Sequence, residues 1–383
     1  MKILNSLYYY RPHFSGLTVY TERLAKSLVE RGFDVSIVTS QYEPSLPLSE
    51  DDEGVHIQRV PVAFFISKGP VMPLFVWTIG RQARKHDVLH LHVPQLAAAP
   101  AALLGRLMGK PIILTYHCDL KLPPTWINQV INIASTLLSR IAIAASDVIV
   151  TNTRDYAEHS PVLKRKLDKV HAIPPPIEIA PVREDVVASL RTRFQLKSEQ
   201  KLIGMAARLA SEKGAEYLAR ALPKIMQEYP QARVLFVGKH EGVVGEEEYA
   251  QRLKPILEEL GDHWTFLGIL PEEELSAFYK ICDVTVLPSV NPTESFGMVQ
   301  VESMMAGTPV VATDIPGVRS PIRETGMGVI VPPRDSDALA NGILSILRTP
   351  DAFQRDPAQI QSLYGTNAVT SAYERLFREV MKG

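Results

Sequence analysis

One pattern constrains the fold of this 383-residue chain more than any other, because it occurs near the start of each half. It consists of a buried strand, a loop, an amphipathic helix and a second buried strand, and it spans residues 2–39 and residues 201–238. Strands that alternate with helices in this way form parallel sheets covered by helices. The sequence therefore predicts an α/β protein with two doubly wound, Rossmann-like domains in tandem.

A run of three prolines, Pro174 to Pro176, marks the predicted boundary between the two domains. Proline removes backbone donors and holds the chain extended, so this segment is interpreted as a hinge. The first domain then covers residues 1–172, and the second covers residues 173–363.

The carboxyl-terminal residues 364–383 are predicted to return to the first domain. Tyr373, Leu376 and Phe377 follow helical spacing, and no strand comes after them. A helix with one apolar face must bury that face, and we expect the first domain to cover it.

Composition narrows the class of protein. The chain is 46% hydrophobic and has a formal net charge of −1, which is typical of a soluble protein and gives no indication of nucleic-acid binding. Its two cysteines, Cys118 and Cys282, are too few for a disulfide framework, and the amino terminus lacks a signal-peptide pattern. These features predict a cytoplasmic protein.

Basic residues are concentrated toward the amino terminus. Residues 1–170 contain 19 Lys or Arg and 14 Asp or Glu, an excess that suits a phosphorylated acceptor or an anionic membrane. Two apolar stretches, residues 60–79 and 122–145, lie in the same region, and Gly and Pro interrupt the first too often for a membrane-spanning helix. Contact with the inner face of a membrane and a chance asymmetry both remain open.

The most distinctive motif places Glu294 and Glu302 eight residues apart around a Phe-Gly turn that is predicted to open an apolar helix. Eight helical residues advance about 80° beyond two turns, so both carboxylates can serve one pocket if Glu294 precedes the first turn. The amides of Phe296, Gly297 and Met298 would then be free for an anionic or hydroxyl-rich ligand. Two solvated surface glutamates are the alternative.

A loop with two cations, Arg208 and Lys213, follows the predicted strand at 201–206. Ligands of doubly wound sheets bind beyond the carboxyl ends of the strands. Arginine can fork onto two oxygens and lysine supplies a point charge, so the pair is suited to a diphosphate. A pair of solvated loop cations is the alternative.

The first domain offers two weaker candidates. Gly16 ends the loop after the first strand, where a missing side chain lets backbone approach a phosphate, and His117 follows the strand at 112–116. A turn glycine and a structural histidine are the alternatives. His90 and His92 share one strand face without a third ligand, so we interpret them as strand packing and predict no metal site.

With these motifs the chain resembles the retaining glycosyltransferases of family 4. That family has the GT-B fold, in which two Rossmann-like domains face each other across a cleft and a carboxyl-terminal helix crosses back to the first domain. The chain departs from the family at Ser15, where a second glycine is common, and at Pro175-Pro176, where Asn-Gly is common. The shared signatures are Glu294-Ser-Phe-Gly with Glu302, Ala306-Gly-Thr-Pro-Val-Val-Ala312, Ala207-Arg208-Leu with Glu212-Lys213-Gly214, and more loosely His117 and Gly16.

The resemblance implies an enzyme that moves a hexosyl unit from a UDP- or GDP-sugar to a hydroxyl acceptor with retention of configuration and without a metal or other cofactor. The process would be glycolipid or cell-surface polysaccharide synthesis, with a lipid-linked or a soluble acceptor. Residues with implied catalytic roles are Arg208, Lys213, Glu294 and His117. Residues with implied donor-binding roles are Gly16, Phe296, Gly297, Met298 and Glu302.

Other functions remain open. A sugar-nucleotide epimerase, a phosphorylase and a non-catalytic nucleotide-sugar binder are compatible with the same fold. A dinucleotide-dependent oxidoreductase is disfavoured, because neither residues 7–16 nor residues 207–214 contain a Gly-x-Gly-x-x-Gly turn.

Overall fold

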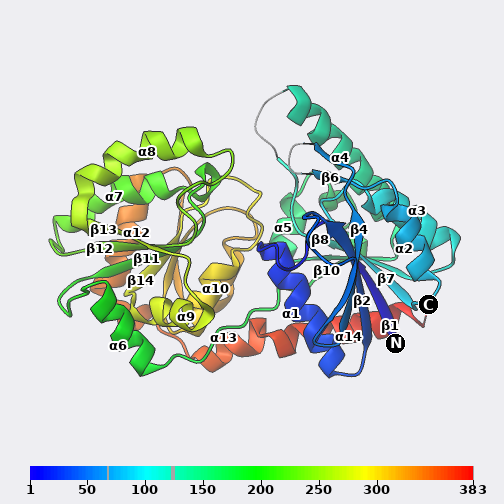
Figure 1. The fold of residues 1–383 in the computed structure, drawn as a ribbon. Coiled ribbons are helices and arrows are strands. Elements are labelled where there is room, and N and C mark those ends of the chain that lie inside the picture. Colours follow the sequence, from blue (N-terminus) through cyan, green and yellow to red (C-terminus); the bar gives the residue numbers. More distant parts are fainter. Residues whose placement is uncertain (67–68, 122–125, 383) are drawn as a thin grey trace. The chain divides into compact units, whose positions relative to one another are not determined.

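The computed structural model describes residues 1–66, 69–121 and 126–382, and the chain forms two compact units (Figure 1). The first unit contains Met1–Pro176 and the carboxyl-terminal residues from Gly365 onward, and the second contains Ile177–Tyr364. The chain leaves the first unit slightly later than residue 172, because the amide of Ile173 still donates to Thr151 O at 2.9 Å.

The first unit is built on an eight-stranded sheet in the order β10-β9-β8-β7-β1-β2-β4-β3. Its pairs are parallel except for β3 and β4, which are antiparallel, and a separate antiparallel pair joins β5 to β6. Its strands are β1 (Lys2–Ser6), β2 (Asp34–Gln41), β3 (Ser49–Asp52), β4 (Val55–Pro61), β5 (Phe64–Ile66), β6 (Gly69–Val71), β7 (Val88–Val93), β8 (Ile112–Tyr116), β9 (Val148–Thr151) and β10 (Val170–Ala172). Its helices are α1 (Gly16–Glu30), α2 (Phe75–Ala83), α3 (Ala98–Leu107), α4 (Trp126–Ala145), α5 (Arg154–His159) and α14 (Thr366–Val380).

The second unit is built on a six-stranded parallel sheet in the order β13-β12-β11-β14-β15-β16. Its strands are β11 (Leu202–Ala206), β12 (Arg233–Val237), β13 (Trp264–Gly268), β14 (Val284–Leu287), β15 (Val310–Thr313) and β16 (Gly328–Val331). Its helices are α6 (Glu184–Arg193), α7 (Ala215–Met226), α8 (Glu247–Leu260), α9 (Glu272–Ile281), α10 (Met298–Met305), α11 (Ser320–Thr325), α12 (Ser336–Arg348) and α13 (Pro357–Tyr364).

Both sheets reverse their strand order beside their first strand, as the sequence pattern predicted for doubly wound domains. In the first unit β1 lies between β2 and β7, and in the second β11 lies between β12 and β14. The loops that leave the carboxyl ends of two such neighbouring strands go to opposite faces of the sheet and leave a crevice for ligands. In the second unit these are the loops that carry the predicted site residues.

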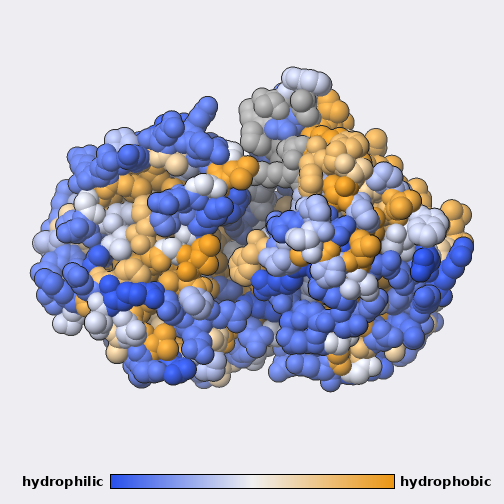
Figure 2. All heavy atoms as spheres, in the orientation of Figure 1, coloured by the Kyte–Doolittle hydropathy of each residue, from blue (hydrophilic) through white to orange (hydrophobic). Residues whose placement is uncertain are grey.

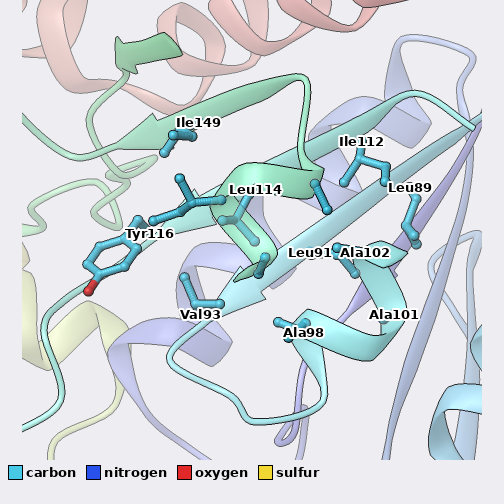
Figure 3. Packing of buried hydrophobic residues seen from close by; sticks show 14 of the residues in the cluster. Leu89, Leu91, Val93, Ala98, Ala101, Ala102, Ile112, Leu114, Tyr116 and Ile149 are labelled. Atoms are coloured by element: carbon cyan, nitrogen blue, oxygen red, sulfur yellow. The ribbon is translucent and has the colours of Figure 1, made fainter. Parts of the chain in front are cut away.

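Small side chains let α3 pack closely on the first sheet (Figure 3). Ala98, Ala101 and Ala102 face the cluster that contains Leu89 and Leu91 of β7. A Cβ at Gly105 would lie only 2.9 Å from a Leu89 methyl group. Because helix and sheet approach so closely, the inward face of α3 has no room for larger residues, and its leucines lie elsewhere on the helix.

The predicted return of the carboxyl-terminal helix is confirmed. Helix α14 packs against α1, and its Tyr373, Leu376 and Phe377 belong to the same buried cluster as Tyr20. Arg31 extends this contact at the surface, where its guanidinium donates to Asn367 O at 2.8 Å. The chain therefore ends on the unit in which it begins.

The two apolar stretches of the first unit form different structures. Residues 60–79 contain the end of β4, the β5–β6 pair and the start of α2, while residues 126–145 form the whole of α4. Residues 67–68 and 122–125 belong to these stretches but lie outside the described residues. Among the helices that the structure describes, none combines the length and the apolar character needed to cross a bilayer.

Candidate functional site

The loops after β11 and β14 are joined by backbone contacts. The amide of Val290 donates to Glu212 O at 3.0 Å. Gly214, which caps α7 in the left-handed conformation (φ 73°), approaches so closely that a Cβ would lie 2.0 Å from Pro288 O. Glycine is therefore required at position 214 for both its conformation and its lack of a side chain.

An ion pair connects the same two loops. Lys213 Nζ lies 2.6 Å from Glu294 Oε2, and each side chain is mostly buried. The other carboxylate oxygen of Glu294 accepts the amide of Gly297 at 3.0 Å. One carboxylate therefore holds the lysine at the start of α10, where the helix dipole favours negative charge.

The predicted Phe-Gly turn does open a helix. Gly297 has φ 79° and precedes Met298, the first residue of α10, and a Cβ at Gly297 would lie 2.2 Å from a Leu287 methyl group. One expectation was wrong: the amide of Gly297 is not free, because Glu294 accepts its hydrogen bond. The first amides of a helix lack partners within the helix, and here the Glu294 carboxylate satisfies that of the residue just before α10.

Arg208 also has an acidic partner that sequence reasoning missed. Its guanidinium forms an ion pair with Glu212, four residues later on the same loop. The two cations expected at a diphosphate are thus each balanced by a carboxylate, Arg208 by Glu212 and Lys213 by Glu294. A bound diphosphate would have to share these cations or exchange places with the carboxylates.

Glu302 lies on the side of α10 that packs against α9. It is only 8% exposed, and its Oε2 accepts the hydroxyl of Tyr279 at 2.9 Å. A buried carboxylate requires such donors, because water cannot solvate it. Tyr279 was not singled out from the sequence, since an aromatic residue within an apolar helix is usually only part of the core.

The side chains of Phe296 and Met298 belong to the core of the second unit. Phe296 is buried, and its ring lies edge-on to Tyr364 with 5.8 Å between the ring centroids. Met298 packs against the same cluster. The buried Phe296 can contribute only backbone groups to a ligand, whereas Met298 is partly exposed.

In the first unit, His117 ends a chain of hydrogen bonds. Its amide donates to Val93 O at 3.0 Å, and its Nε2 lies 2.9 Å from His92 Nδ1. His92 Nε2 lies 3.3 Å from Asn5 Oδ1, which can only accept. His92 therefore carries its proton on Nε2 and accepts from His117, and this leaves the Nδ1 of His117 as an acceptor.

Burial keeps these histidines neutral. Desolvation lowers the pKa of His117 to about 3, and it lowers the pKa of His92 well below the usual value. His90 is fully buried, and desolvation, with a smaller contribution from His117, lowers its pKa to about 3. A neutral His117 can accept a hydrogen bond from a hydroxyl group, but it cannot neutralise a phosphate.

Gly16 is the exposed first residue of α1. Ser15 caps this helix, and its Oγ accepts the amide of Thr18 at 3.2 Å. One turn farther along, the ring of Tyr20 lies edge-on to His117, with 4.9 Å between the centroids. Helix α1 therefore links the two candidates of the first unit.

Potential metal ligands do not gather at these positions. Within the described residues, no group of three or more His, Cys, Asp or Glu side chains has an arrangement that could hold a metal ion. His90 bonds Thr115 Oγ1 at 2.7 Å, and its ring lies beside His92. These contacts agree with the interpretation of both histidines as strand packing.

Two family models match the chain. A glycosyl transferase 4-like domain matches residues 15–176, and the glycosyl transferases group 1 model matches residues 188–360. Among curated proteins, a D-inositol 3-phosphate glycosyltransferase of Acidothermus cellulolyticus is 28% identical over 365 residues, which cover 87% of this chain and 78% of that protein.

Solved structures share the fold over the whole chain. Sucrose-phosphate synthase from Thermosynechococcus elongatus has a TM-score of 0.78 at 20% identity and covers 100% of this chain and 99% of its own. The HepE protein of Anabaena, solved in complex with UDP-glucose, has a TM-score of 0.74 at 19% identity and covers 99% of this chain and 100% of its own. Together with the two family models, they identify the chain as a glycosyltransferase with the GT-B fold, formed by a glycosyl transferase 4-like domain and a group 1 domain.

Proposed function

We propose that the protein transfers a hexosyl unit from a UDP- or GDP-sugar to a hydroxyl acceptor, with retention of anomeric configuration and without a metal ion. The link from Lys213 through Glu294 to Gly297 carries this proposal, because it places a cation, a carboxylate and a helix start at the switch point of the second sheet. HepE, a structural neighbour, was solved with UDP-glucose, and this supports a nucleotide-sugar donor.

In the proposed reaction, the bond between the anomeric carbon and the diphosphate oxygen breaks, and the acceptor oxygen bonds to the same face of that carbon. The acceptor proton passes to the departing phosphate. Negative charge grows on the phosphate in the transition state, so Arg208 and Lys213 stabilise that state more than the ground state. His117, as a neutral acceptor, would orient a sugar hydroxyl, and Gly16 would let backbone approach the donor.

The second unit would hold the nucleotide. Glu302 is proposed to accept the ribose hydroxyls, with Tyr279 fixing the orientation of its carboxylate. Glu294 and the backbone of Phe296 to Met298 would contact the sugar. Because Oε2 of Glu302 already accepts from Tyr279, the ribose hydroxyls would share this carboxylate with the tyrosine.

We further propose a lipid-linked acceptor and a cytoplasmic enzyme that works at the inner face of the membrane. The basic excess within residues 1–170 supports this location, since such residues attract anionic lipid headgroups. A soluble phosphorylated acceptor would use the same positive charge, and the acceptor assay must compare both.

The first test is thermal stability with UDP, GDP, ADP and NAD, in the wild type and in Glu302→Ala. A ligand at 100 times its Kd adds about 2.7 kcal/mol to the free energy of unfolding. We expect one nucleoside diphosphate to stabilise the wild type and not the variant. No response, or a response to NAD alone, would contradict the proposal.

Product analysis then separates the related activities. Transfer to an acceptor with retained configuration, unchanged in EDTA, supports the proposal. An epimerised donor, cleavage that depends on inorganic phosphate, or donor binding without release of the nucleotide would each assign the protein to one of the alternative functions.

A further inference from the structure

Helix α4 carries a stripe of bulky apolar side chains on its outward side. Its exposed side carries Trp126, Val130, Ile133 and Leu137, spaced four, three and four residues apart. Trp126 is 76% exposed and Ile133 is 70% exposed. A helix on a soluble domain normally turns such a stripe toward the core.

The inward side of the same helix already supplies apolar residues to the core, because Leu138, Ile141 and Ile143 pack in the cluster of the first unit. Ser135 and Ser139 are both buried, beside the buried Ala142 and Ile143. Folding therefore does not account for the outward stripe, because the first unit forms its core without it. An exposed stripe of this kind marks an interaction surface.

The neighbouring helices extend the stripe into one surface. Helix α3 packs between α4 and α2, and each of these helices also exposes apolar residues. Hydrophobic colouring gathers over this part of the first unit in Figure 2. We define the outer face as the exposed apolar residues of α2, α3, α4, the β5–β6 pair and the turns just before α2 and α3, which are Phe64, Phe65, Ile66, Leu74, Trp77, Leu96, Leu103, Leu107, Trp126, Val130, Ile133 and Leu137.

The charge of these helices has one sign. Helices α2, α3 and α4 contain no Asp or Glu, and each contains one arginine, namely Arg81, Arg106 and Arg140. Arg140 follows Leu137 on the exposed side of α4, and Arg81 lies over the ring of Trp77. Arg106 lies 3.6 Å from Asp147, but both side chains are well exposed, so this pair is weak.

We propose that the outer face docks on an anionic phospholipid membrane. Exposed tryptophan, large aliphatic residues and arginine without acidic residues are the composition of a helix face that lies in the membrane interface. The contact would be peripheral, with apolar side chains among the acyl chains and arginines at the phosphates. This inference deepens the proposed function by naming the surface and its lipid partner, yet its test needs neither donor nor acceptor.

Vesicle binding provides the direct test. The full-length protein should sediment with phosphatidylcholine vesicles that contain about a third phosphatidylglycerol, bind phosphatidylcholine alone several-fold more weakly, and lose affinity as salt rises. Two of the three tryptophans, Trp77 and Trp126, lie on the outer face, while Trp264 is buried in the second unit. Binding should therefore shift tryptophan emission to shorter wavelength, and Trp126→Phe should reduce that shift.

Variants distinguish this surface from a general effect of charge. Ile133→Glu combined with Leu137→Glu should weaken vesicle binding at least about tenfold, because both side chains are exposed and would lose apolar contact with lipid. Ile269→Glu, in the second unit, is the matched control, since Ile269 is 76% exposed and lies outside the outer face. Nucleotide-induced stabilisation should stay at the wild-type level in both variants.

Sedimentation of the protein without vesicles tests whether a second copy of the chain, and not a membrane, covers the outer face. If a second copy of the chain covers the outer face, Ile133→Glu will convert a stable dimer to monomer, and vesicles will bind neither protein. That result would overturn the membrane proposal, as would equal vesicle binding by the double variant and the Ile269→Glu control. Failure of the donor assays alone would leave it intact.

Discussion

Glu294 joins Lys213 to the first turn of α10, because one of its carboxylate oxygens lies 2.6 Å from Lys213 Nζ and the other accepts the amide of Gly297 at 3.0 Å. The lysine and the glutamate come from loops after two neighbouring strands, β11 and β14. The position of the cation thus depends on the correct pairing of those strands.

Removal of the lysine should impair turnover more than substrate binding. We expect Lys213→Ala to lower kcat by about 10²–10³, the usual loss when one donor aimed at developing charge is removed. Lys224→Ala is the control, because Lys224 forms an exposed pair with Asp337 on the same unit. Steady-state kinetics with the identified donor provide the measurement, and unchanged kcat in Lys213→Ala would remove this lysine from the mechanism.

A single methyl group at Gly214 should damage both stability and the site. In Gly214→Ala the new Cβ would meet Pro288 O at 2.0 Å, so the two site loops would have to separate. Gly242→Ala shares the left-handed conformation but meets nothing within 4 Å, and we expect it to cost only about 1 kcal/mol. Urea denaturation should show a clearly larger loss for Gly214→Ala, and similar losses would argue against the close contact.

The hydroxyl of Tyr279 should affect nucleotide binding through Glu302. Tyr279→Phe removes a hydrogen bond to a buried carboxylate and should lower stability by about 1.5–3 kcal/mol, with weaker nucleotide binding. Tyr364→Phe also removes a hydroxyl that bonds a carboxylate, that of Glu324, and keeps its ring in place. Thermal shifts with and without nucleotide should show reduced ligand stabilisation in Tyr279→Phe only.

The buried histidines should make the first unit sensitive to acid. The pKa of His90 is about 3 when folded and near 6.5 when unfolded, so the unfolded state binds more protons between these values. Stability is fully present above pH 6.5 and falls as the pH drops toward 3, by up to about 1.4 kcal/mol per pH unit for this group.

Urea denaturation from pH 7 to pH 4 measures that slope. His90→Leu should lower stability at neutral pH, because Thr115 loses its bond to His90 and keeps only the one to Tyr373. It should also reduce the number of protons taken up on unfolding in acid by up to about one. His171→Gln, an exposed histidine on β10, should keep the wild-type slope. An unchanged slope in His90→Leu would show that other groups control the acid response.

Local patterns in the sequence identified the correct elements. Apolar periodicity located β1, α1, β11 and α7 within a few residues of their observed ends, because burial of one helix face or both sheet faces leaves a readable pattern. The Phe-Gly turn before α10 was also predictable, since a glycine at positive φ there is a local requirement.

The partners of the candidate residues could not be read from these patterns. Glu294 and Lys213 are 81 residues apart, and Tyr279 and Glu302 are 23 residues apart, so only the strand order and helix packing bring each pair together. For the same reason, the amide of Gly297 was expected to be free. Its partner could be identified only after the backbone placed the Glu294 carboxylate beside it.

By itself, the sequence determined the two α/β units, the positions of their loops and the residue types available for chemistry, because these depend on short-range periodicity and turn geometry. Only the tertiary structure decided which charges pair, which ring nitrogen of His117 carries the proton and which side of α4 faces outward. Periodicity alone indicates that a helix has two sides, but which one is buried depends on the fit against the sheet. In α4, Ile143 and the small Ser139 fit there, and Trp126 and Ile133 remain exposed.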